Sequence, residues 1–148
     1  MNRIEVNERT QDLIQQLLNV WEKSVRATHL FLSDAEIENI KKYVPEALNE
    51  VAHLIIAKDD EGHPAAFMGI EDEGLEMLFI TPEQRGKGLG KDLLRLGIEK
   101  YDVKQLTVNE QNPQAKGFYE HLGFEVFKRT DHDEQGDPYP LLYMRLKK

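Results

Sequence analysis

The chain contains no cysteine, and this absence excludes several kinds of chemistry. Disulfides, cysteine metal ligands and an acyl-cysteine mechanism are all impossible. Long hydrophobic runs are also missing, since no apolar stretch approaches the length that spans a membrane. The N-terminus Met1-Asn2-Arg3-Ile4-Glu5 lacks the apolar core of a signal peptide. We therefore expect a cytoplasmic protein with no membrane partner.

Positive charge is scarce, because 19 Lys and Arg residues face 27 Asp and Glu residues and the net charge is -8. Acidic residues are spread through 59–61, 71–76 and 131–137, a pattern that disfavours a nucleic-acid partner. Most of this acid is expected on a solvated surface, so net charge selects no substrate. The 5 histidines show no paired ligand spacing and no Gly-x-Ser-x-Gly elbow occurs. We expect neither a metal site nor a serine hydrolase.

The 148 residues, of which 40% are hydrophobic, suit a single domain over residues 1–148 with one core. Apolar spacing predicts a strand at 4–6 and helices over 13–25, 33–44, 89–101 and 113–122. The second helix begins at a capping box, Ser33-x-x-Glu36, and is expected to end before Pro45. Further strands are predicted over 53–58, 65–70, 75–80, 105–109, 124–130 and 141–146. The chain therefore mixes strands and helices.

Within the predicted strand 75–80, one residue is an acid in an otherwise apolar run. Alternation places Glu76, Leu78 and Ile80 on one face, and Leu75, Met77 and Phe79 on the other. An unpaired buried carboxylate is costly, so such an acid usually reaches solvent in a cleft or has a functional partner. The alternative is a surface acid that continues the run of acids at 71–73.

Glycines at alternate positions, Gly86, Gly88 and Gly90, lie between this strand and the helix that follows it. Without a Cβ the chain can turn sharply there and direct successive N–H groups toward an anion. The positive end of the helix dipole and the cations Arg85, Lys87 and Lys91 add to this attraction. The segment predicts a pocket for the phosphates of a cofactor, with a flexible surface turn as the alternative.

Two common nucleotide loops do not fit this segment. The P-loop needs Gly-Lys-Ser/Thr, but Asp92 follows Lys91, and the dinucleotide pattern Gly-x-Gly-x-x-Gly is incomplete. What remains, Arg85-x-x-Gly88-x-Gly90, resembles the GNAT superfamily of acyl-CoA-dependent N-acyltransferases, in which this loop holds the pyrophosphate of coenzyme A. The resemblance implies cofactor contacts by Arg85, Gly86, Lys87, Gly88, Leu89, Gly90 and Lys91.

A second block, residues 109–124, resembles the strand, helix and strand that follow in GNAT proteins. Its local physics agrees, because Asn112 is a good N-cap, Pro113 suits the first helical turn, and Gly123 stops the helix. Residues 21–29, 108–112 and 138–142 resemble a bacterial subgroup of small acetyltransferases, the YjaB type. The resemblance implies a GNAT-like α/β fold, with a central twisted mixed sheet flanked by helices.

The same resemblance implies the activity. We expect an N-acetyltransferase that moves an acetyl group from acetyl-CoA directly to a primary amine of a small molecule or peptide, through a ternary complex and without a metal. Two alternatives remain open: a non-catalytic acyl-CoA-binding or sensing module, and a protein-lysine or N-terminal acetyltransferase. A homodimer is compatible with either.

The resemblance also assigns roles to two side chains. Tyr119 is expected to donate a proton to the departing thiolate; alternatively, it belongs to the core stripe of its helix and only orients the cofactor. Glu76 is expected to act as general base on the acceptor ammonium, often through water; its alternative is the surface acid described above.

Other contacts implied by the resemblance surround these two residues. Backbone groups of Leu78, Phe79 and Ile80 are expected to bond the pantetheine arm and the acetyl carbonyl. Asn109 and Asn112 are expected beside the same arm, unless Asn112 is only a helix cap. On the acceptor side we expect His29, Phe31 and Tyr139. Their alternatives are an ordinary loop histidine, a hydrophobic staple and a rigid turn.

Overall fold

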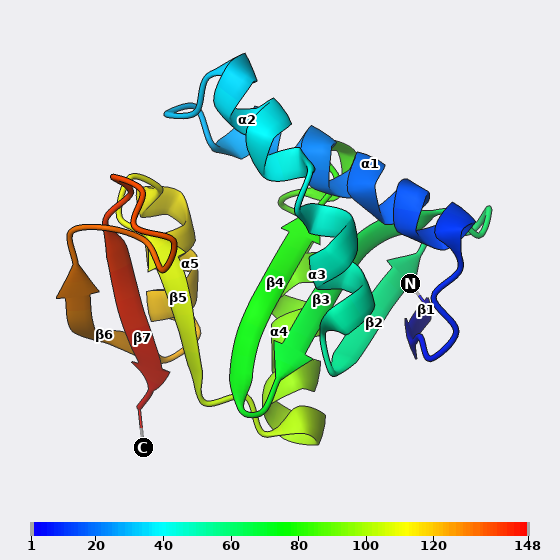
Figure 1. Ribbon diagram of the computed structural model, residues 1–148. Helices are drawn as coiled ribbons and strands as arrows, with labels where there is room; N and C mark the ends of the chain where they lie inside the picture. The colour runs from blue at the N-terminus through cyan, green and yellow to red at the C-terminus, as the bar shows by residue number, and fades with distance from the viewer. Residues whose placement is uncertain (1, 148) are drawn as a thin grey trace.

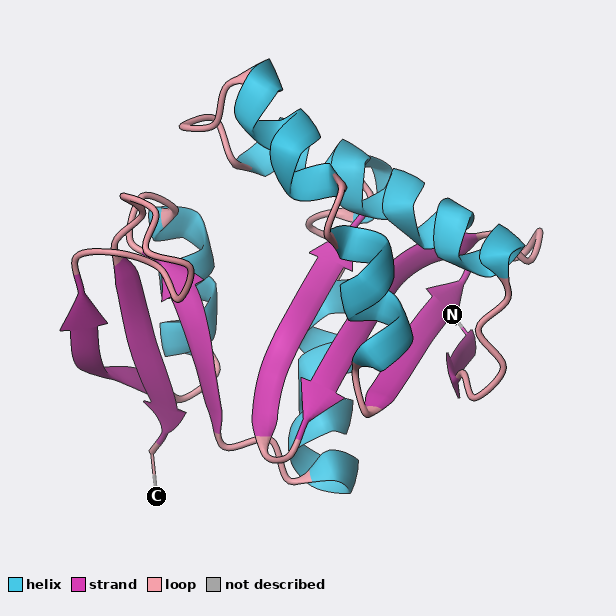
Figure 2. Ribbon diagram, in the orientation of Figure 1, coloured by secondary structure: helices cyan, strands magenta, loops and turns pink. Residues whose placement is uncertain are grey.

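The computed structural model describes residues 2–147, which form helices on both sides of one sheet (Figures 1 and 2). In chain order the elements are β1 (Asn2–Glu5), α1 (Gln11–Thr28), α2 (Asp34–Lys41), α3 (Val44–Glu50), β2 (His53–Lys58), β3 (Pro64–Glu71), β4 (Gly74–Ile80), a 3-10 turn (Pro82–Gln84), α4 (Leu89–Tyr101), β5 (Gln105–Asn109), α5 (Pro113–His121), β6 (Phe124–Thr130) and β7 (Leu141–Leu146). Across this part of the chain, no helix is long and apolar enough to cross a bilayer.

The strands form one seven-stranded sheet in the order β1-β2-β3-β4-β5-β7-β6. All neighbours are antiparallel except β4 and β5, which are parallel, so the predicted mixed sheet is confirmed. One core cluster packs α1, α2 and α3 against one face, and a second cluster packs α4 and α5 against the other. The sheet is thus the middle layer of three.

The parallel pair β4 and β5 is joined at only one end. Gly74 pairs with Gln105 and Leu75 with Leu106, and no further pairing occurs in the described chain. Beyond these residues the two strands diverge, and Figure 1 shows the gap that opens between them. Backbone N–H and C=O groups on this edge of β4 are therefore free to bond a ligand.

A β-bulge changes which side chains of β4 share a face. Ile70 pairs with Leu75, but the adjacent Gly69 pairs with Met77, so Glu76 is the extra residue. Leu75 consequently packs in the same cluster as Leu78 and Ile80, whereas Met77 and Phe79 pack in the other. The alternation predicted from sequence was wrong for Leu75, because strict alternation assumes an unbroken ladder.

The second predicted helix is divided into two in the structure. Its capping box is confirmed, with Ser33 Oγ accepting from the Glu36 N–H at 3.1 Å and Glu36 Oε1 accepting from the Ser33 N–H at 2.9 Å. However, α2 ends at Lys41 and a separate helix, α3, begins at Val44 with Pro45 in its first turn. The prediction that Pro45 marks a helix end was wrong, because proline also fits the first turn, where no intrahelical N–H bond is needed.

Candidate active site

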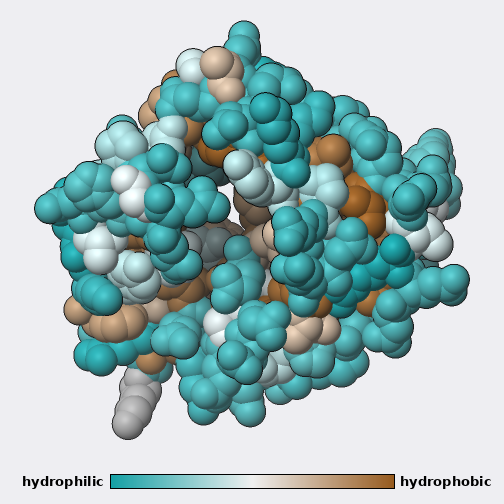
Figure 3. Space-filling view, in the orientation of Figure 1, coloured by the Kyte–Doolittle hydropathy of each residue, from teal (hydrophilic) through white to brown (hydrophobic). Residues whose placement is uncertain are grey.

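A cavity of about 400 Å³ lies where β4 and β5 diverge. Its walls come from β4, the glycine loop, the first turn of α4, the end of β5, α5 and the C-terminal turn of α1. The space-filling view shows a deep hollow near the middle of the molecule, open to solvent on the face drawn (Figure 3). The site therefore joins both halves of the sheet and is accessible from outside.

The glycine loop presents unpaired backbone donors to this cavity. Gly86 and Gly88 have φ angles of 76° and 83°, which favour glycine, and an added Cβ at either would meet no atom within 4 Å. Gly88 is the N-cap of α4, and no side chain caps the helix. The N–H groups of the first turn are therefore available to an anion, which the helix dipole also favours.

Gly90 is required for a different reason, which is close packing. A Cβ at this position would lie 2.7 Å from Ile80 Cδ1 and 3.4 Å from Phe118 Cζ. A side chain at this position would therefore have to displace the Ile80 side chain, which packs between α4 and β4. Beside the loop, Arg85 Nη2 donates to Gln114 Oε1 at 3.3 Å, which links the loop to the start of α5.

Tyr119 is held by α5, whose start is fixed by Asn112 Oδ1 accepting from the Ala115 N–H at 3.2 Å. The Tyr119 ring packs edge-on against Phe118 and Phe124, with centroids 5.2 and 6.2 Å away. Its hydroxyl has no hydrogen-bond partner in residues 2–147 and is not fully buried, because every fully buried side-chain oxygen in this range has a partner. Tyr119 lines the cavity. Burial raises the pKa of Tyr119, so the phenol is protonated at neutral pH.

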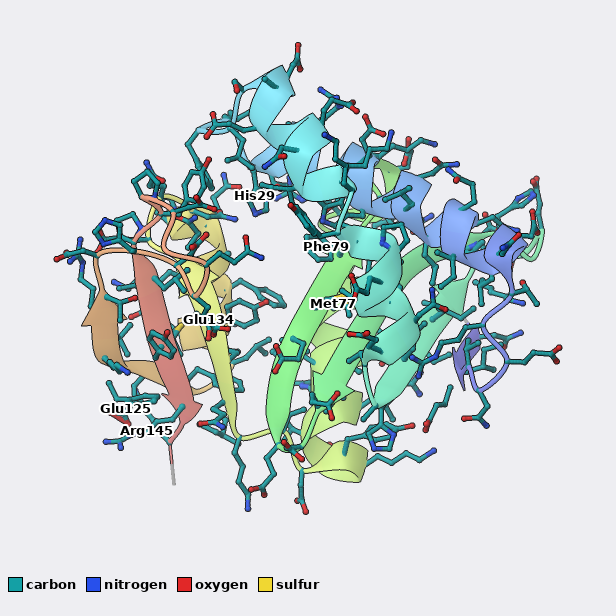
Figure 4. The ribbon with its side chains drawn as sticks, viewed as in Figure 1. His29, Met77, Phe79, Glu125, Glu134 and Arg145 are labelled. Atoms are coloured by element: carbon teal, nitrogen blue, oxygen red, sulfur yellow. The ribbon has the colours of Figure 1, made fainter. Side chains whose placement is uncertain are left out.

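Glu76 reaches the cavity from the bulge in β4. Burial, followed by the negative charges of Glu134, Glu71 and Asp72, raises the pKa of this carboxyl group above its ordinary value. Of these acids, Glu134 lies in the segment between β6 and β7. Figure 4 labels it, together with Met77 and Phe79 on β4. No ion pair to Glu76 is formed within the described residues. A raised pKa brings such a carboxyl group closer to the range in which a general base works.

The expected acceptor residues are divided by the structure. His29 lines the cavity at the end of α1, over the gap between β4 and β5 (Figure 4). Phe31 does not line it, and its ring packs against the His29 ring with the two centroids 5.5 Å apart. Tyr139 is also outside the lining, and its hydroxyl donates to Glu36 Oε2. Of these three residues, only His29 is placed to meet an acceptor directly.

Most of the other predicted residues come together in one lining. The cavity is bordered by Leu78, Phe79, Ile80, Arg85, Gly86, Gly88, Leu89, Gly90, Lys91, Asn109 and Asn112. Lys87 is not among them. The sequence analysis missed Ser24, Thr28, Gln84, Thr107 and Gln114, which also border it. Of these, Ser24, Thr28 and Gln114 lie in segments that the resemblance had already singled out, whereas Gln84 and Thr107 had no such signal.

Comparison with known proteins agrees with this geometry. Residues 21–147 match the family described as the acetyltransferase (GNAT) domain. The chain is 41% identical over 128 residues to the peptidyl-lysine N-acetyltransferase YjaB of Salmonella typhimurium, a match that covers 86% of this chain and 88% of that protein. It is 38% identical over 132 residues to the Escherichia coli protein of the same name, with 86% of each chain covered.

Solved structures show the same likeness. The solution structure of apo YjaB from Escherichia coli superposes with a TM-score of 0.85 at 34% identity, covering 98% of this chain and 97% of that one. The PaiA N-acetyltransferase of Thermoplasma acidophilum, solved with coenzyme A, shares the fold with a TM-score of 0.73 at 22% identity, and the match covers both chains completely.

A glycine loop at a helix start, beside a parallel strand pair that diverges around a cavity, defines an acyl-CoA-dependent transferase. The chain belongs to the GNAT acetyltransferase family. It is an N-acetyltransferase that uses acetyl-CoA and a primary amine, as the resemblance in its sequence implied.

Proposed function

We propose that the acceptor is the side-chain amine of a lysine within a peptide or protein. The observation that carries this proposal is the 41% identity to a peptidyl-lysine N-acetyltransferase over 86% of the chain. The open hollow in Figure 3 supports it, because a polypeptide must lie outside the cavity while one side chain enters. The cytoplasmic location and the absence of nucleic-acid and membrane partners expected from the sequence stay predictions, as does a homodimer.

In this proposal the glycine loop binds the pyrophosphate of coenzyme A. The N–H groups at the start of α4 supply hydrogen bonds, and Arg85, Lys87 and Lys91 supply positive charge. The free edge of β4, at Leu78 to Ile80, bonds the pantetheine arm and the acetyl carbonyl, with Asn109 and Asn112 facing it across the cavity. A β4 N–H directed at that carbonyl would stabilise the oxyanion that forms during attack.

Two side chains then move protons. Glu76 accepts a proton from the acceptor ammonium, directly or through water, and so frees the nitrogen lone pair for attack. Tyr119 donates its phenolic proton to the departing thiolate. The raised pKa of each group supports its role, because Tyr119 arrives protonated and the Glu76 carboxylate is made more basic.

An acceptor panel tests this proposal. Thiol release from acetyl-CoA would be followed with peptides that contain one lysine, matched peptides in which arginine replaces that lysine, free amino acids and polyamines. N-terminally blocked peptides separate the lysine side chain from the terminal amine. We expect turnover with the blocked lysine peptide and none with its arginine partner. Turnover confined to polyamines or free amino acids would contradict a peptide acceptor.

A further inference from the structure

The reaction requires two protons to leave the acceptor nitrogen. A primary ammonium carries three protons and the product amide nitrogen carries one. The proposed role of Glu76 accounts for the proton lost before attack. A second proton must leave after the nitrogen has attacked the carbonyl carbon, when it carries a positive charge again. The chain should therefore offer a second proton acceptor in the cavity.

Few side chains in the cavity can fill this role. The titratable residues in its lining are His29, Glu76, Arg85, Lys91 and Tyr119. Arg85 and Lys91 are cations without a free lone pair, and Tyr119 must remain protonated to act as a donor. Glu76 is already protonated at this stage. His29 remains.

The tautomer of His29 is fixed by its neighbour. Thr28 Oγ1 donates to the Ser24 carbonyl oxygen at 2.8 Å, and the same Oγ1 lies 2.8 Å from His29 Nδ1. A hydroxyl group has one proton, which Thr28 has already given to Ser24. The contact with His29 must therefore be Nδ1–H donating to Oγ1. Neutral His29 thus carries its proton on Nδ1, and Nε2 holds a free lone pair.

Nε2 is free of partners within the described chain, and His29 lines the cavity. Nε2 has no hydrogen-bond partner in residues 2–147, and it is not fully buried, because every fully buried side-chain nitrogen in this range has a partner. Phe31 packs beside the ring and restricts its position. Burial lowers the pKa of His29, which keeps the imidazole neutral near pH 7. The group is therefore oriented, uncharged and able to accept a proton.

We propose that Nε2 of His29 accepts the second proton from the acceptor nitrogen, and that the Thr28 hydroxyl holds the imidazole in the tautomer this requires. This inference rests on the proposed function, because it assigns a residue to the same acetyl transfer. Thr28 is a positioning residue, since it acts only through His29.

The nitrogen lone pair forms the N–C bond, and the π electrons of the thioester carbonyl move onto its oxygen. The positively charged nitrogen then gives one proton to His29 Nε2. The oxygen lone pair re-forms the C=O bond as the C–S bond breaks, and the thiolate takes the proton of Tyr119. Glu76 and His29 each release one proton to solvent and Tyr119 regains one from solvent, which restores all three groups and leaves one proton released for each acetyl group transferred.

The test compares His29→Gln and His29→Ala with the parent, using whichever amine the parent acetylates. We expect kcat to fall roughly 100-fold in both, the lower end of the range for one proton-transfer group, with unchanged affinity for coenzyme A measured by calorimetry. Added imidazole should restore part of the kcat of His29→Ala, which a merely structural role of His29 would not produce. His121→Gln is the matched control, because His121 is exposed on α5 outside the cavity.

A second pair of variants tests the positioning role. Thr28→Val removes the hydroxyl and should lower kcat severalfold without changing coenzyme A affinity, whereas Thr28→Ser keeps a hydroxyl and should retain more of the parental kcat than Thr28→Val does. If His29→Gln turns over at the parental rate, or if imidazole restores nothing to His29→Ala, this inference is overturned while the proposed function stands. If the parent acetylates no amine at all, both fail together.

Discussion

The Tyr139 hydroxyl donates a hydrogen bond to the Glu36 carboxylate, across 103 positions of sequence. Glu36 lies in the first turn of α2 and Tyr139 lies just before β7, so this bond joins α2 to the segment between β6 and β7. The two halves of the sheet are themselves joined by the pairing of Gly74 with Gln105 and of Leu75 with Leu106. We call the side-chain link between α2 and the β6–β7 segment the closure.

Loss of this bond should loosen the segment between β6 and β7. We expect Tyr139→Phe to increase hydrogen exchange of the amides in residues 131–140 and to raise KM for the acceptor, with coenzyme A affinity unchanged because the phosphate loop lies elsewhere.

The hydrogen bond from Tyr139 also lowers the pKa of Glu36, so the closure is present at neutral pH and weakens as pH falls through that lowered pKa. Tyr43→Phe is the control, since Tyr43 is exposed and makes no side-chain hydrogen bond in residues 2–147. Equal exchange and KM in parent and Tyr139→Phe would refute the closure.

Gly88→Ala should weaken coenzyme A binding. The positive φ of 83° at Gly88 is strained for any residue with a Cβ, so the loop must shift and misalign the N–H groups of α4. We expect calorimetry to show a loss of at least about tenfold in affinity. Gly117→Ala, in α5 with no atom within 4 Å of the added Cβ, is the matched control and should bind normally. Parental affinity of Gly88→Ala would remove the loop from the phosphate site.

Tyr119→Phe should separate catalysis from binding. The variant keeps the ring that packs on Phe118 and Phe124 but lacks the proton donor. Since a thiolate is a good leaving group even without a donor, we expect kcat to fall about tenfold to 100-fold, rather than to vanish, with coenzyme A affinity retained. Phe118→Leu, on the same helix, should lower stability more than it lowers kcat. An unchanged kcat in Tyr119→Phe would leave Tyr119 with only a packing role.

Glu76→Gln should cost activity in a pH-dependent way. As a base, Glu76 works only when ionised, so the ratio of parental to variant kcat should be largest above its raised pKa and approach one below it. The substitution should lower activity but should not lower stability. A raised folded-state pKa means that the parent loses stability as pH rises between the unfolded and folded pKa values, so the variant should melt at an equal or higher temperature at pH 7. A rate ratio that does not vary with pH would reject the base role.

The sequence predicted those features that depend on neighbouring residues. The capping box at Ser33, the Asn112-Pro113 helix start and the glycine loop all follow from local rules, and the structure has each of them. The motifs also predicted the family, because two of them occur in the expected order. Local rules failed at Pro45, where the same residue type is compatible with either the end or the first turn of a helix.

Features that depend on distant partners were beyond the sequence. The bulge at Glu76 arises from the pairing of β4 with β3, and the role proposed for Thr28 depends on its hydroxyl donating to the Ser24 carbonyl oxygen while it contacts His29 Nδ1. Likewise, nothing local to Tyr139 indicates that it bonds α2. Tertiary packing decides these contacts, so only the folded chain shows how the acceptor side of the site is built.

The most direct test of the account is to locate the transferred acetyl group. The protein would be incubated with acetyl-CoA and an N-terminally blocked peptide that contains one lysine and one other nucleophile, such as serine, and the product would be sequenced by tandem mass spectrometry. We predict acetylation on the lysine side chain alone, at a rate that falls in Tyr119→Phe. Acetyl-CoA that binds tightly while the peptide and free amines stay unmodified would contradict the proposal that this chain acetylates lysine.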